Sequence, residues 1–139
     1  MVLGTLGVVG GGLLSAMTAA GPSYHASWAV AYVVLVVGVA QIILGVAQAS
    51  LTGGFVRGCI IAWEAVCWNL GSATVLTGTL ASVPTLLYAG IILLLAALVL
   101  FAVAIRHGRR GILFTVTWVV IIVLLVSMPV GAIIQAVTG

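Results

Sequence analysis

The sequence predicts an all-α protein that crosses a membrane several times, as judged from its composition, its long apolar segments and the placement of its few charges. Of its 139 residues, 65% are hydrophobic and only 4% are charged. About a quarter of the residues in a soluble domain are charged, because its surface must be hydrated. This chain must therefore present most of its exterior to lipid. The composition also excludes a soluble enzyme, a disulfide-rich secreted protein and a disordered chain. It excludes a nucleic-acid-binding protein as well, because four basic residues cannot follow a phosphate backbone.

Five apolar segments reach, or nearly reach, the roughly 20 residues that a helix needs to cross the hydrocarbon core. They cover residues 2–20, 27–50, 55–80, 84–105 and 111–136. Their long aliphatic runs lack the alternation of membrane β-strands, and a helix satisfies its own backbone hydrogen bonds in lipid. The connections are too short to fold alone, so we expect one integral membrane domain. Because the first segment is rich in glycine, four spans are the alternative to five.

The basic residues fall in two connections, one with Arg57 and the other with Arg106, Arg109 and Arg110. Five alternating crossings place these connections on the same side of the membrane. Because positive residues favour the cytoplasmic side, we expect a cytoplasmic N-terminus and an external C-terminus. The lysine-free composition, rich in alanine, valine and glycine, is compatible with a high-GC bacterial gene and therefore with a bacterial inner membrane.

Small residues repeat along the first two segments at the spacing that lets membrane helices pack closely. They are Gly7, Gly11, Ser15 and Ala19 in the first segment, and Gly38 and Gly45 in the second. We expect these residues to form helix contacts. The fourth and fifth segments are aliphatic all round over 91–101 and 121–126. Those helices can face lipid or a hydrophobic partner, which is either another membrane protein or a further copy of the chain.

Glu64 is the only acidic residue, and it lies seven residues after Arg57, hence about 10 Å deeper along a helix. A carboxylate near mid-helix costs about 2.5–3.5 kcal/mol to insert, so we expect this group to be neutral, paired or beside water. Gln41 and Gln48 bracket its depth on the preceding segment, and Asn69 follows on its own segment. Two interpretations remain open: a protonatable coupling site, or a buried group that fixes the register of the helices.

The other chemistry-bearing residues do not combine into a predicted site. His25 and His107 are expected on opposite sides of the membrane, so they cannot jointly hold a haem. Cys59 and Cys67 are eight residues apart on one helix, about 12 Å along its axis, which is too far for a disulfide. A single carboxyl without a second ionisable group argues against catalysis. No metal and no cofactor are predicted.

Two functions follow as hypotheses. The first is a non-catalytic structural or regulatory subunit of a larger membrane assembly, because so little of the chain lies outside the membrane. The second is a small oligomeric transporter or channel coupled to protons or cations, with Glu64 as the coupling group and Gln41, Gln48 and Asn69 lining the path. An enzyme acting on lipid is the weakest alternative. The sequence names neither a substrate nor a partner.

Overall fold

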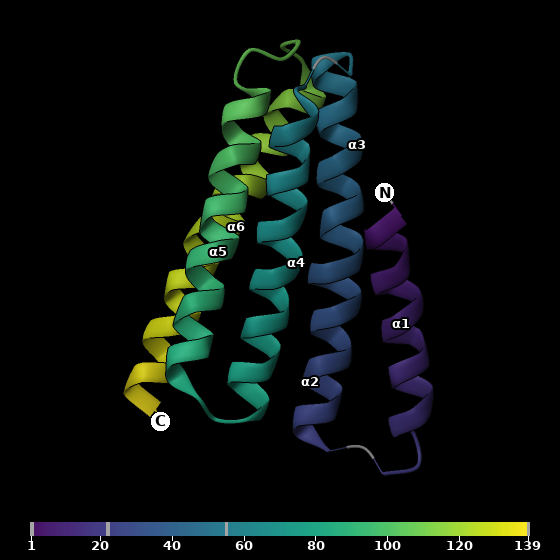
Figure 1. Cartoon of the computed structure of the whole chain (residues 1–139), viewed down its shortest axis with the longest axis vertical. Coiled ribbons are helices and arrows are strands. Elements are labelled where there is room, and N and C mark those ends of the chain that lie inside the picture. Colours follow the sequence, from purple (N-terminus) through teal and green to yellow (C-terminus); the bar gives the residue numbers. More distant parts are fainter. Residues whose placement is uncertain (1, 22, 55, 139) are drawn as a thin grey trace. The chain divides into compact units, whose positions relative to one another are not determined.

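The computed structural model describes residues 2–21, 23–54 and 56–138, with side chains for all of these except Tyr24 and 129–138. Over that part of the chain it is all-helical, which confirms the predicted class (Figure 1). The helices are α1 (Val2–Thr18), α2 (Tyr24–Tyr32), the π-helix η1 (Val33–Ala40), α3 (Gln41–Thr52), α4 (Gly58–Leu80), α5 (Pro84–Ile105) and α6 (Ile112–Thr138). The segments α2, η1 and α3 follow one another as one long helix.

Within the part of the chain that the structure describes, three helices are long and apolar enough to cross a membrane: His25–Thr52, Gly58–Leu80 and Pro84–Ile105. They match the second, third and fourth segments expected from the sequence. Two further apolar helices, Val2–Thr18 and Ile112–Met128, are shorter by the same measure over the described residues. Length and hydropathy therefore support three of the five expected crossings.

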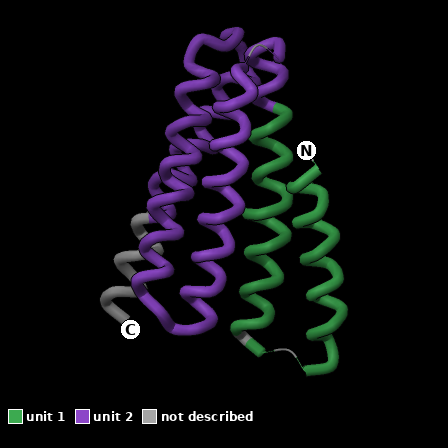
Figure 2. Tube along the Cα trace, viewed as in Figure 1, with its two compact units in different colours: residues 1–46 green, residues 47–139 purple. Residues whose placement is uncertain are grey.

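The chain forms two compact units, residues 1–46 and 47–139 (Figure 2). The first unit contains α1, α2, η1 and the beginning of α3. The second contains the end of α3 together with α4, α5 and α6. Each unit has its own closely packed helix pair.

In the first unit, α1 packs against η1 through glycines that leave no room for a side chain. A Cβ atom at Gly7 would lie 3.0 Å from the Cα atom of Gly38, and one at Gly38 would lie 2.6 Å from Cγ2 of Val8. Gly4 and Gly11 are also buried. The two backbones therefore touch directly, as small residues permit in membrane helices.

The small-residue series expected from the sequence is only partly used in this contact. Gly7, Gly11 and Gly38 lie in it, whereas Ser15 is exposed and Ala19 follows the last residue of α1. A Cβ atom at Gly45 would meet open space. The contact runs in antiparallel order, with Gly4 beside Ile42, Gly7 beside Gly38 and Gly11 beside Val34. Gly45 follows Ile42 in the chain and therefore lies beyond the start of α1 at Val2.

In the second unit, α4 and α5 form an antiparallel pair that is also closest at glycines (Figure 1). A Cβ atom at Gly78 would lie 2.5 Å from the backbone nitrogen of Leu87, and one at Gly90 would lie 2.7 Å from the carbonyl oxygen of Gly71. The uniformly aliphatic α5 therefore has a buried face. That face consists of Gly90, Leu94, Ala97, Leu98, Phe101 and Ile105.

A three-residue turn holds α4 and α5 antiparallel. The N–H of Val83 donates to the carbonyl of Gly78 at 2.8 Å, and the N–H of Ser82 donates to that of Thr79 at 3.4 Å. These two bonds are the Schellman pattern that ends a helix, with Ser82 in the left-handed region at φ 55°. Pro84 then opens α5, where its missing N–H costs nothing.

We expect Gly78→Ala and Gly38→Ala each to destabilise the protein by about 1–3 kcal/mol, because the added methyl group forces backbone atoms apart. The measurement is the loss of helicity during unfolding in a mild detergent, followed by circular dichroism.

Gly45→Ala is the matched control. It adds the same methyl group to the long helix that also contains Gly38, but at a position where a Cβ atom meets open space. Alanine favours helix over glycine by up to about 1 kcal/mol, so this variant should be neutral or slightly stabilised. Equal destabilisation of all three variants would show that backbone contact does not hold these helices.

Candidate functional site

Glu64 and Gln48 form a buried hydrogen-bonded pair within the second unit. The Nε2 group of Gln48 donates to both carboxyl oxygens of Glu64, at 3.1 Å to Oε1 and 2.9 Å to Oε2. Glu64 is only 7% exposed and Gln48 only 6%. A buried polar group is costly unless it is hydrogen-bonded, and here each side chain supplies a bonding partner for the other. The pair links α3 to α4.

The local helices hold this pair in place. Gln48 lies in the last two turns of α3, where the hydroxyl of Thr52 donates back to its carbonyl at 2.7 Å. On α4, Glu64 begins a buried series at four-residue steps that continues through Trp68 and Ser72. The hydroxyl of Ser72 is buried without a hydrogen-bond partner. The carboxyl thus belongs to a packed helix face.

Neither Asn69 nor Gln41, the other two predicted polar residues, is hydrogen-bonded to Glu64. The Nδ2 group of Asn69 donates to the carbonyl of Ala65 at 2.8 Å, so its amide is bonded to its own helix. Gln41 lies in the first unit, and its Oε1 atom is buried without a hydrogen-bond partner. Of the four residues proposed for a polar core, the second unit therefore brings together Gln48 and Glu64.

No group of three or more histidine, cysteine or acidic side chains within the described residues is placed to hold a metal ion. Cys59 is exposed and Cys67 is half-buried, and both are free thiols.

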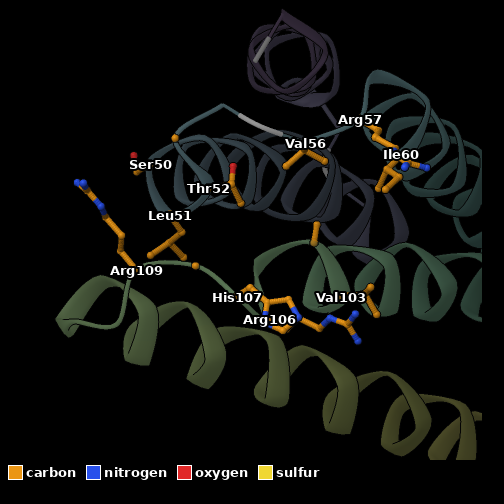
Figure 3. A pocket seen from close by; sticks show the side chains of 13 residues that line it. Ser50, Leu51, Thr52, Val56, Arg57, Ile60, Val103, Arg106, His107 and Arg109 are labelled. Atoms are coloured by element: carbon orange, nitrogen blue, oxygen red, sulfur yellow. The ribbon is translucent and has the colours of Figure 1, made fainter.

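The ends of α3, α4 and α5 surround a groove of about 700 Å³ in the second unit (Figure 3). Arg57, which precedes α4, lines it together with Arg106, His107 and Arg109 from the connection between α5 and α6. Its remaining lining residues are Ser50, Leu51, Thr52, Gly53, Val56, Ile60, Val103, Ala104 and Gly108. The fourth arginine, Arg110, is exposed and is not among the lining residues.

Backbone contacts position this arginine-bearing connection. The N–H of Arg109 donates to the carbonyl of Leu51 at 3.1 Å, and the N–H of Gly108 donates to that of Ile105 at 2.8 Å. A Cβ atom at Gly108 would lie 3.0 Å from that of Leu51, so glycine permits this approach. The two arginine-bearing connections consequently meet at one end of the second unit. Sequence reasoning missed the groove, because it is formed when residues 106–109 fold back onto α3.

Comparisons of the chain with protein-family models, with curated proteins and with solved structures found no match.

We expect Gln48→Leu to destabilise the protein by about 1–2 kcal/mol, because it leaves both oxygens of Glu64 without their donor. Glu64→Leu should have a similar effect by stranding the amide. The double variant should recover most of the loss, because it removes both polar groups at once. The measurement is a double-mutant cycle of unfolding in detergent. Strictly additive losses would show that the two side chains do not interact.

Proposed function

We propose that the chain is a multi-pass membrane protein that serves as a non-catalytic structural or regulatory subunit of a larger assembly. The observation that carries this proposal is the enclosure of its only acidic side chain. Both oxygens of Glu64 accept hydrogen bonds from Gln48, and the residue does not line the groove. A coupling carboxyl would need access to water or to an ion path. A buried, bonded carboxyl is better suited to fixing helix register.

An exposed small-residue face on α1 supports association with a partner helix. Gly12, Ser15 and Ala16 are exposed, and a Cβ atom at Gly12 would meet open space. These positions follow the three- and four-residue spacing of one helix face. Because small residues let another backbone approach closely in lipid, this face suits a second copy of the chain or an unlike membrane subunit.

For the topology we propose five crossings of a bacterial inner membrane, with the N-terminus in the cytoplasm and the C-terminus outside. The support is the meeting of Arg57, Arg106 and Arg109 at one groove, because clustered arginines favour the cytoplasmic side. The helices Val2–Thr18 and Ile112–Thr138 supply the first and last crossings.

Single cysteines should report this topology in a background with Cys59→Ala and Cys67→Ala. We expect a membrane-impermeant maleimide to label Ala81→Cys in intact cells, because that turn is external. Gly111→Cys should be labelled only after the cells are opened. A fluorescent reporter ahead of residue 1 should be cytoplasmic; an external reporter would favour four crossings, and the reverse cysteine pattern would invert the proposed orientation.

The competing proposal is a proton- or cation-coupled transporter that uses Glu64, and Glu64→Gln distinguishes the two. The variant loses the ionisable group but keeps a side chain that can bond Gln48. For a subunit, we expect it to fold and to retain the chains that co-purify with the wild type in mild detergent. We also expect wild-type proteoliposomes to show no pH-driven flux above that of empty liposomes. A flux from the chain alone that disappears in Glu64→Gln would establish the transporter instead.

A further inference from the structure

We propose that the arginine-lined groove binds the phosphate headgroup of an anionic lipid, with the lipid's apolar part lying against the groove's aliphatic residues. This site is separate from the Glu64–Gln48 pair, whose residues do not line the groove. The inference rests on the proposed membrane topology but not on the proposed role as a subunit.

The groove has positive charge and no acidic partner of its own. Arg57, Arg106 and Arg109 line it, and none of its lining residues is acidic. The only acidic side chain in the sequence, Glu64, accepts hydrogen bonds from Gln48 elsewhere. Arginine binds phosphate oxygens through a planar fork of donors. Arg57 and Arg106 lie on two sides of the groove and supply donors that a phosphate requires, whereas Figure 3 shows the Arg109 side chain extending away from both.

The groove also changes from polar to apolar along the helices. Ile60 lies in α4, three residues after Arg57. Val103 lies in α5, three residues before Arg106. Three residues are about 4.5 Å and nearly one turn of helix, so each aliphatic residue lies deeper on the same side as its arginine. Figure 3 shows Arg57 and Ile60 at the start of α4, and Val103 and Arg106 at the end of α5. A phospholipid has the same order, with charge at the boundary and hydrocarbon below.

The helix dipoles do not account for anion binding at this place. The groove lies at the ends of α3 and α5 but at the start of α4. Two helix C-termini carry partial negative charge and one N-terminus carries partial positive charge, so these ends together do not favour an anion. The arginine side chains must supply the attraction.

Size and composition favour a lipid over free phosphate. The groove encloses about 700 Å³, within the range of sites for drug-sized ligands, and a phosphate ion would fill only a small part of it. The aliphatic residues Leu51, Val56, Ile60 and Val103 would then stay in contact with water. Basic pockets between membrane helices on the cytoplasmic side are known to hold lipid headgroups.

The test uses the full chain, purified in a neutral detergent and freed of phospholipid. Short-chain phosphatidylglycerol and phosphatidylcholine are titrated in separate experiments, and binding is measured by calorimetry. We expect phosphatidylglycerol to bind at least about tenfold more tightly than phosphatidylcholine. Arg57→Gln and Arg106→Gln should each weaken that binding about fivefold, and Arg109→Gln should weaken it less. Arg109→Gln should still fold, because the contact of residue 109 with Leu51 is made by its backbone N–H.

Arg110→Gln is the matched control, because it removes one charge from the same connection at a residue that does not line the groove. It should change binding by less than about twofold. Equal losses in Arg110→Gln and in the groove variants would overturn the proposal, as would equal binding of the two lipids. Arg57→Lys, which keeps the charge, provides a folded comparison if a glutamine variant loses helicity.

Inorganic phosphate serves as the competitor that separates the two possible sources of the phosphate group. We expect it not to displace phosphatidylglycerol at comparable concentrations. Displacement at those concentrations would assign the groove to a free anion and overturn the lipid assignment. Because binding is measured on the isolated chain, a negative result leaves the co-purification test of the subunit proposal unaffected.

Discussion

Within a bilayer, two helices gain little by burying leucine against leucine, because the surrounding lipid tails are as apolar as the side chains. The closeness of backbone approach then decides which helix faces meet, since dispersion attraction falls steeply with small gaps. The pairs in the two units follow this rule. Gly7 meets Gly38 in the first unit, and Gly71 and Gly78 meet α5 near Gly90 and Leu87 in the second. The aliphatic face of α5 is buried because its neighbour can come close.

The Glu64–Gln48 pair links α3 to α4, whereas the glycine contacts lie between α1 and η1 and between α4 and α5. Sliding α3 along α4 by one turn, about 5.4 Å, would carry the amide out of reach of both carboxyl oxygens. The buried polar groups would then lose their hydrogen bonds, at a cost of about 1–3 kcal/mol. Such a pair therefore contributes more to register than to stability, which is the best-supported use of buried polar groups.

Much of the fold was predictable, because it depends on properties that one sequence carries. Low charge and long apolar runs predicted the helical class and three helices that are long and apolar enough to cross a membrane, and the glycine spacing predicted Gly7, Gly11 and Gly38 as contact residues. The choice among several small-residue faces was not predictable, because it depends on where crossed helices come closest. Gly4, Gly71, Gly78 and Gly90 were therefore missed. Nothing in the sequence analysis indicated the π-helical stretch Val33–Ala40 either.

For the polar residues too, the sequence predicted some of the contacts but not others. Depth along neighbouring segments identified Gln48 as a possible partner of Glu64, because antiparallel helices bring equal depths together. Depth could not show that the Asn69 amide bonds the carbonyl of Ala65, a local interaction that competes with longer-range contacts. The groove was even harder to predict from the sequence, because it depends on the backbone hydrogen bond between Arg109 and Leu51.

The hydrogen bond between Arg109 and Leu51 has a consequence for the arginines that favour one orientation of the protein in the membrane. It fixes the connection between α5 and α6 through main-chain atoms, so the side chains of Arg106 and Arg109 are not needed to hold it. With no acidic residue lining the groove, charge compensation must come from outside the chain. In the proposed topology the nearest anions are the lipid phosphates of the cytoplasmic leaflet, whose surface potential attracts basic residues within about one Debye length. The arginines that favour one orientation during insertion would then bind the membrane surface in the folded protein.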